Sequence, residues 1–201
     1  MRRSENMLPK PLQQDLEFQS KAFFSKYNEK IIDIFIFGSV VKSEDKPNDL
    51  DILIVFKKNN DLKLVQEFRK ILESKVKLKV EVTGKSYPEL FVKTFVAREA
   101  ILTEAYSLVN KVGFSEGLGF KSIVMFNYQL KGKTKSERMR FYYSLYGRGS
   151  TGMLERLNAV KYADTIILCP VDNLVKMREF LNSWSLEFKE TPLLIPSRLT
   201  N

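Results

Sequence analysis

Residues 34–56 read IFIFGSVVKSEDKPNDLDILIVF and contain two apolar segments separated by a polar one. The apolar segments, residues 31–37 and 52–56, are rich in β-branched and aromatic side chains, whereas the segment between them is rich in turn-forming and charged residues. This pattern is typical of two β-strands joined by a loop. Because side chains alternate along a strand, Asp49 and Asp51 are predicted to lie on the same face of the second strand.

Two carboxylates on one face at the mouth of a strand repel each other, so they favour a counter-charge. A divalent cation supplies it, and a site built only of oxygen ligands favours Mg²⁺ or Mn²⁺ over zinc. The alternative is that Asp49 and Asp51 merely cap and solvate an Asx-rich turn. That alternative explains one aspartate but not a second at the next position on the same face.

Gly38-Ser39, nine intervening residues and Asp49-x-Asp51 together resemble the signature of the DNA polymerase beta-like nucleotidyltransferases. The size of the chain is closest to that of the small "minimal" members. The resemblance covers roughly residues 31–82 and implies an α/β (α+β) fold, a small mixed sheet flanked by helices. It also implies that Gly38 and Ser39 hold the nucleotide phosphates and that Asp49 and Asp51 bind the metals.

Two positions depart from the family pattern. The family usually has a glycine a few residues after Gly-Ser, where this chain has Ser43 or its neighbours, and a serine before the first aspartate, where this chain has Asn48. Asparagine and serine share turn chemistry, so both departures are compatible with the loop.

The resemblance also implies a third carboxylate on a later strand. Residues 75–83, KVKLKVEVT, alternate between apolar and polar side chains and predict a half-buried, antiparallel-type strand. Glu81 is its only acidic residue, so we assign Glu81 as the third metal-facing and catalytic carboxylate. The alternative is a surface glutamate paired with Lys77 or Lys79.

The composition excludes several classes of chemistry. The chain of 201 residues contains no histidine, which rules out histidine-based triads, histidine general bases and histidine-ligated zinc. The single cysteine, Cys169, cannot form an internal disulfide and fits a reducing cytoplasm. No apolar run approaches the ~20 residues that span a bilayer, and no secretion signal is recognisable, so we expect no membrane association.

The sequence predicts two domains. We expect a nucleotidyltransferase-like domain over residues 1–112, a glycine-rich linker over 113–119 and a basic α+β domain over 120–201. The helices expected in the first domain are residues 12–28, 61–74 and 89–109. The second domain is expected to have the order β-α-α-β-α-β, with strands 122–130, 165–169 and 187–195 and helices 134–146, 153–160 and 173–184.

The formal net charge of +9 fits a polyanionic partner, although a lysine-rich proteome would produce the same value. Much of the excess lies in the second domain, in Lys131, Lys133, Lys135, Arg138, Arg140 and Arg148. Aromatic residues interleave with these cations, which together predict a surface that holds an RNA or DNA end. The alternative is that Met139, Tyr142, Tyr143 and Tyr146, at helical spacing, are core residues.

The resemblance therefore leads us to expect a metal-dependent transferase that moves a nucleoside monophosphate from a nucleoside triphosphate, ATP or CTP, to a hydroxyl acceptor. The basic second domain favours an RNA end such as that of tRNA as the acceptor. One alternative is a protein partner, as in the AMPylating transferases of toxin–antitoxin systems. Another is a non-catalytic nucleic-acid-binding module that keeps the fold.

Overall fold

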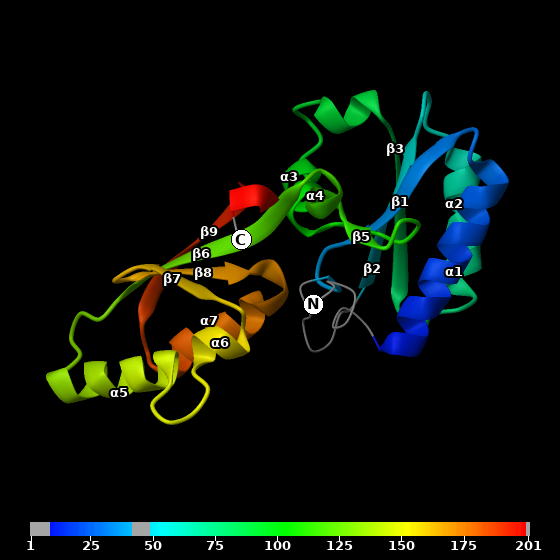
Figure 1. Ribbon diagram of the computed structural model, residues 1–201. Coiled ribbons are helices and arrows are strands. Elements are labelled where there is room, and N and C mark those ends of the chain that lie inside the picture. The colour runs from blue at the N-terminus through cyan, green and yellow to red at the C-terminus, as the bar shows by residue number, and fades with distance from the viewer. Residues whose placement is uncertain (1–8, 42–48, 200–201) are drawn as a thin grey trace. The chain divides into compact units, whose positions relative to one another are not determined.

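The computed structural model describes residues 9–41 and 49–199, so Ser43 and Asn48 lie outside the described residues. The chain divides into two compact units, Met1–Gly119 and Phe120–Asn201 (Figure 1). Within the described residues, no helix combines the length and the hydrophobicity that crossing a membrane requires.

The first unit is built on a five-stranded sheet with the order β3-β2-β1-β4-β5. Its strands are β1 (Ile31–Phe37), β2 (Asp49–Phe56), β3 (Lys79–Ser86), β4 (Tyr106–Ser107) and β5 (Val112–Gly113). Its helices are α1 (Lys10–Tyr27), α2 (Leu62–Glu73), the 3-10 helix η2 (Pro88–Phe91), α3 (Arg98–Glu104) and α4 (Phe114–Gly117).

The two faces of this sheet are covered differently. Helices α1 and α2 pack on one face, as Figure 1 shows, and bury its apolar side chains, among them Leu50 and Ile52. On the other face, Ile101 of α3 packs with Leu53 and Val55 of β2. Alternation along β2 thus sends Asp49 and Asp51 to the face that α3 covers, beyond the buried part of the strand.

Strand β3 differs from the strand expected over residues 75–83. It begins at Lys79 and pairs with β2 in parallel, not antiparallel. The reason is α2, which Asp61 caps by accepting hydrogen bonds from the backbone N–H groups of Lys63 and Leu64. A helix between two neighbouring strands returns the chain to the starting end of the sheet, so the second strand runs parallel to the first.

The prediction of one long helix over residues 89–109 is also wrong. Glu89 accepts hydrogen bonds from the N–H and the Oγ of Ser86, at 2.6 and 2.7 Å, which satisfies a backbone donor just before the expected helix. However, only η2 follows it, and after α3 the chain extends again as β4. Pairing of β4 with β1, at Phe35 and Ile36, needs extended backbone that a continuous helix would not provide.

Residues 113–119 belong to the first unit and are not a linker. Gly113 closes β5, and α4 follows directly. The Phe114 ring meets the Phe35 ring edge-on, with centroids 5.1 Å apart. The glycines that favoured a linker therefore lie in a packed segment, because a phenylalanine in their midst reaches the sheet.

The second unit has a four-stranded sheet with the order β7-β8-β6-β9, and every pair is antiparallel. Its strands are β6 (Phe120–Gln129), β7 (Val160–Ala163), β8 (Ile166–Pro170) and β9 (Glu187–Pro196). Its helices are α5 (Lys135–Tyr146), α6 (Met153–Arg156), α7 (Leu174–Ser183) and the short 3-10 turns η3 (Val171–Asn173) and η4 (Ser197–Leu199).

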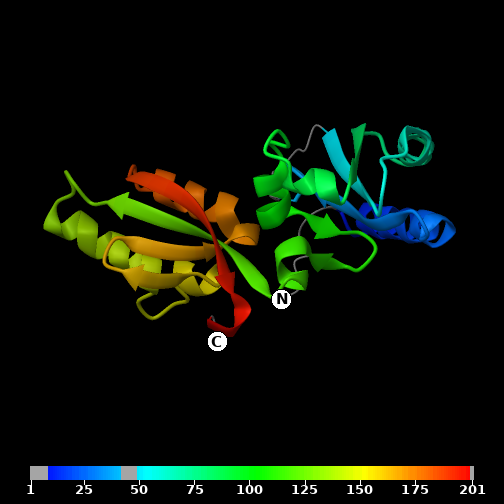
Figure 2. The same ribbon diagram turned by 90° about the horizontal axis from the view of Figure 1, so that it is seen from above.

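This unit contains one strand that the expected order β-α-α-β-α-β lacks. Helix α6 ends at Arg156, and β7 follows as an edge strand whose four residues are all exposed. Such a strand has no apolar alternation by which a sequence could reveal it. With α5 and α7 contributing to one apolar core (Figure 2), the unit has the split β-α-β-β-α-β topology of ferredoxin-like folds.

One stability prediction concerns the contact between β3 and α2. A Cβ at Gly84 would lie 2.6 Å from Val65 Cγ2 and would also overlap Asn60 Oδ1. We expect Gly84→Ala to lower the free energy of unfolding by about 1–3 kcal/mol because β3 must move away from α2. Gly117→Ala is the control, since its nearest neighbour would be 3.7 Å away. Equal urea midpoints for the two variants would contradict the prediction.

Candidate functional site

Three carboxylates and one ammonium group gather on one face of the β2–β3 pair, which we call the acidic edge. The parallel register places Asp49 beside Lys79 and Asp51 beside Glu81. Neighbours in register point to the same face of a sheet, so the four side chains form a two-by-two arrangement. Asp49 and Asp51 are partly buried, whereas Lys79 and Glu81 are exposed.

Gly38 brings the loop after β1 against this edge. Phe37 pairs with Asp51 across the β1–β2 ladder, and Gly38 follows with a φ of +81°, which favours glycine. A Cβ at position 38 would collide with Oδ2 of Asp51 and lie 3.4 Å from its Cγ. The two family positions that the sequence separates by more than ten residues are thus in direct contact.

Ser39 follows in a hydrogen-bonded turn that Val41 closes by donating its N–H to the carbonyl of Gly38, at 3.2 Å. Its Oγ is buried and has no hydrogen-bond partner within residues 9–41 and 49–199. An unsatisfied buried hydroxyl costs about 1–3 kcal/mol, so a ligand that accepts its hydrogen bond would gain from it. Ser39 follows Gly38, which lies against Asp51, and offers a donor for an anionic group.

The electrostatics of the acidic edge favour a cation. Burial raises the pKa of Asp51 first, and the negative charges of Asp49 and Glu81 raise it further, with Lys79 acting in the opposite sense. The raised pKa means that the protein does not fully compensate the negative charge of the Asp51 carboxylate, so a cation would be favoured there. Mg²⁺ is commonly held by one or two carboxylates plus substrate phosphates, and the pair Asp49 and Asp51 fits that requirement.

Glu81 is paired with a lysine rather than left uncompensated. Its carboxylate forms an ion pair with Lys79, and the hydrogen bond from Lys79 is the main reason that its pKa is lowered. Among the residues that the structure describes, no group of three or more acidic side chains is placed to hold a metal ion. The pairing with Lys79 is the arrangement that the sequence allowed as an alternative, so Glu81 as third ligand remains a prediction.

Lys79 is the member of this cluster that the sequence did not identify as facing Asp49. Only the parallel register brings the two residues side by side, and the sequence pattern predicted an antiparallel-type strand. The available signal was the spacing of Lys79 and Glu81, which puts both on one face of their strand.

A hollow among the described residues of the first unit lies away from the acidic edge. It measures about 660 Å³ and is open to solvent. It is lined by Glu29, Lys30 and residues 57–63, at the opposite end of β1 and β2 from Asp51. We place the candidate site at the acidic edge because the carboxylates of β2 and β3 and the turn at Gly38 meet there.

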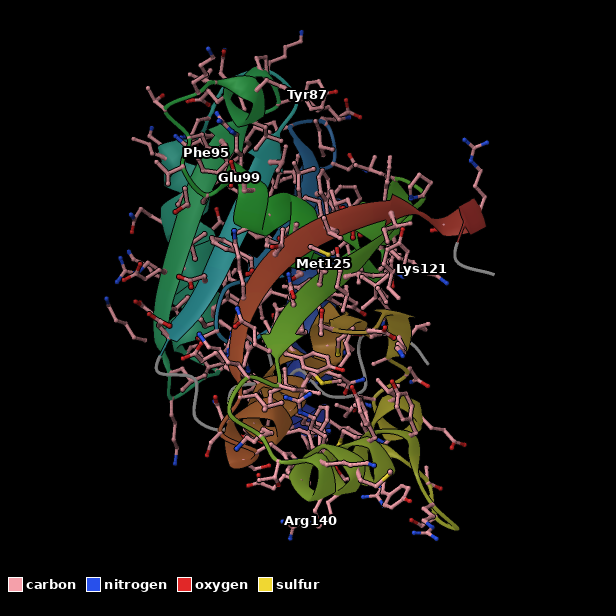
Figure 3. The ribbon with its side chains drawn as sticks, turned by 90° about the vertical axis from the view of Figure 1, so that its left-hand side faces the viewer. Tyr87, Phe95, Glu99, Lys121, Met125 and Arg140 are labelled. Carbon is pink, nitrogen blue, oxygen red and sulfur yellow. The ribbon has the colours of Figure 1, made fainter. Side chains whose placement is uncertain are left out.

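The six cations predicted to bind nucleic acid lie on α5 or in the loops that flank it. All are exposed except Lys133, which is partly buried. Arg138 donates from Nε to the Lys133 carbonyl at 3.0 Å, and the Arg148 guanidinium lies over the Tyr143 ring, 4.5 Å from its centroid. Arg140 points away from the sheet of its unit (Figure 3).

The aromatic residues of α5 are not all core residues. Met139, Tyr143 and Tyr146 are 45%, 38% and 43% exposed and form a stripe at positions i, i+4 and i+7. Phe141 and Leu145 fill the core instead. The core alternative is therefore wrong for those three residues, and α5 presents apolar rings beside its cations.

A comparison with protein families found a match within the first unit. Residues 19–105 match the family model described as "Polymerase beta, Nucleotidyltransferase". The matched segment contains Gly38, Ser39, Asp49, Asp51 and Glu81. Searches of curated proteins and of solved structures found no match. The resemblance seen in the sequence is thus confirmed for the N-terminal half, and the match supports a transferase activity of the nucleotidyl type.

Proposed function

We propose that the chain is a metal-dependent nucleotidyltransferase that moves a nucleoside monophosphate from a nucleoside triphosphate, ATP or CTP, to a hydroxyl at an RNA end. The observation that carries this proposal is the contact of Gly38 with Asp51. It joins the turn that would hold phosphates to the carboxylate that would hold Mg²⁺ or Mn²⁺, within a segment that matches the family.

The residues of the acidic edge have separate roles in this proposal. Asp49 and Asp51 hold the metal, and Ser39 donates its Oγ proton to a phosphate oxygen of the donor nucleotide. Gly38 lets the backbone approach that nucleotide without a side chain in the way. When bound, a divalent ion neutralises charge on the transferring group and lowers the pKa of an attacking hydroxyl.

Glu81 is the proposed third carboxylate. Once released from Lys79, it would face the acceptor and accept the proton of the attacking hydroxyl. A carboxylate in this role also fits a chain that contains no histidine.

The acceptor is proposed from the second unit. Exposed rings beside exposed cations are the combination that binds single-stranded nucleic acid, since rings stack on bases and cations contact phosphates. Tyr143 and Tyr146 supply exposed rings, and Lys135, Arg140 and Arg148 supply exposed charges on the same helix and the loop after it.

Transfer of a labelled nucleotide tests the proposal. The purified chain is incubated with α-labelled ATP or CTP, Mg²⁺ and total cellular RNA, and the products are separated. We expect label on RNA. Label on protein instead would support a protein-modifying transferase. Absence of label on either, together with nucleotide binding that is insensitive to Asp49→Asn and Asp51→Asn, would support a non-catalytic module.

A second measurement tests the acceptor surface. Lys135→Glu combined with Arg140→Glu is expected to weaken binding of a single-stranded RNA oligonucleotide by about tenfold or more and to reduce the salt slope by roughly two. Position 135 lies in the first turn of α5, where a glutamate favours the helix, so the fold should persist.

The matched control for that measurement is Lys189→Glu, which reverses an exposed charge on β9 of the same unit. Fluorescence anisotropy at three salt concentrations provides both the affinity and the slope. If the control weakens binding as strongly as the double variant, net charge rather than the α5 surface explains it.

A further inference from the structure

Lys79 is the cation of the acidic edge. It lies beside Asp49 in the β2–β3 register and forms an ion pair with Glu81, two residues along the same strand face. Its pKa is raised, chiefly by the hydrogen bond to Glu81 and in smaller part by the charge of Asp49. Since its charge also acts to lower the pKa of Asp51, Lys79 interacts with all three proposed carboxylates.

We propose that Lys79 is a built-in counter-cation that holds Glu81 while no metal is bound and competes with the divalent ion for that carboxylate. The inference rests on the proposed metal site, which it deepens by naming what occupies the third ligand. An ammonium group supplies one positive charge where a divalent ion supplies two, so the ion wins when Asp49 and Asp51 bind it at the same time.

The exposure of the pair makes this exchange feasible. The side chains of Lys79 and Glu81 are 67% and 51% exposed. Solvent screens an exposed ion pair and long side chains lose entropy in it, so such a pair is held only weakly. Both side chains can therefore separate without any change in the strands, and Glu81 can turn toward Asp51, its neighbour in the register.

The surrounding charges distinguish Lys79 from an ordinary surface lysine. Arg69 of α2 also lowers the pKa of both Lys79 and Glu81. However, its Nε donates a hydrogen bond to Glu73 at 2.8 Å. Lys77 is also exposed, yet it precedes β3 and has no place in the register with Asp49. Lys77 thus offers a matched control: the same residue type, two positions away, outside the two-by-two arrangement.

Metal affinity tests the inference without any turnover. Free Mn²⁺ is followed by electron paramagnetic resonance during titration of the full chain in the absence of nucleotide. Loss of Lys79 removes a positive charge at ~6 Å from the divalent ion, an effect that salt screens to less than about threefold. It also frees Glu81 to bind the ion, and the two effects together should strengthen binding by about tenfold. We expect Lys79→Met to lower the Kd for Mn²⁺ to that extent, Lys77→Met to change it less than about twofold, and Lys79→Arg to leave it unchanged.

A double variant identifies the partner. If Lys79 acts by holding Glu81, the gain from Lys79→Met should fall below about threefold in a Glu81→Gln background, because only the general charge effect remains. The full gain in that background would show that Lys79 acts without Glu81 and would overturn the inference.

The remaining outcomes separate the inference from the proposed function. If Asp51→Asn leaves the Kd for Mn²⁺ unchanged, the metal site is not at the acidic edge and the proposed function fails with it. If Asp51→Asn weakens binding while Lys79→Met binds Mn²⁺ like the unmodified chain, only the counter-cation is overturned. Equal gains from Lys79→Met and Lys77→Met would likewise overturn it.

Discussion

Asp51→Asn is expected to reduce nucleotidyl transfer by about a thousandfold or more, because it removes a carboxylate proposed to hold the metal without changing the shape of the side chain. Asp51 is the best placed of the three acidic residues for this role. It lies between Asp49 and Glu81 in the β2–β3 register and is contacted by Gly38. The rate of label transfer at saturating nucleotide measures the effect.

The same variant should make the protein more stable. The pKa of Asp51 is raised above its ordinary value of 3.8, so folding disfavours its charged form. This penalty is present at neutral pH and disappears as the pH falls below 3.8, where the carboxyl is protonated in both the folded and the unfolded state. Asp51→Asn should therefore raise Tm at pH 7 and have no such effect at low pH.

Asp15→Asn, an exposed aspartate on α1, is the matched control for both measurements. It should change neither the transfer rate nor Tm. A drop in Tm at pH 7 with Asp51→Asn would show that Asp51 serves the fold, and unchanged transfer would remove it from the proposed mechanism.

Local patterns explain why the centre of the first unit could be predicted from the sequence. The strands around Gly38 and Asp51 are short-range features, each fixed by apolar alternation and by the residues that end it. The contact between Gly38 and Asp51 was not predicted, because the loop that joins the two strands has no periodicity of its own; the resemblance implied only a phosphate-binding role for Gly38 and a metal-binding role for Asp51.

Features that depend on distant segments could not be predicted in this way. The direction of β3 depends on α2 crossing the sheet, and the ladder that places Lys79 beside Asp49 follows from that direction. Similarly, Glu89 accepts the N–H of Ser86 at the start of the expected helix, but the pairing of β4 with β1 prevents a continuous helix over residues 89–109. Sequence patterns describe how a segment prefers to fold, whereas partners elsewhere in the chain decide where that preference stops.

The position of Lys79 beside Asp49, which the sequence did not predict, changes how the acidic edge is understood. From the sequence alone, a bound ion was expected to be what offsets the repulsion among the three carboxylates. The structure shows that the protein itself relieves part of the repulsion, through the Lys79–Glu81 pair. The repulsion that remains acts on Asp51, whose pKa is raised although the charge of Lys79 acts to lower it. Substitutions at Asp51 and at Gly38, which lies against it, should therefore have the largest effects on nucleotidyl transfer.

Gly38→Ala is expected to reduce nucleotidyl transfer by about a hundredfold or more and to lower the free energy of unfolding by about 1–3 kcal/mol. The stability loss has a backbone cause, because a φ of +81° is strained for alanine. The loss of activity has a steric cause. The new Cβ collides with Oδ2 of Asp51, so either the carboxylate or the turn that carries Ser39 must move.

Gly119→Ala separates these two causes. Gly119 has the same φ of +81°, but a Cβ there would meet nothing within 4 Å. The control should lose comparable stability in urea denaturation while it keeps its transfer rate and its Mn²⁺ affinity. Gly38→Ala should lose transfer rate and Mn²⁺ affinity as well as stability, since its new Cβ collides with Asp51, the proposed metal ligand. If the two alanine variants transferred nucleotide at equal rates, the contact between Gly38 and Asp51 would be structural only, and the phosphate-binding turn would have to be sought elsewhere.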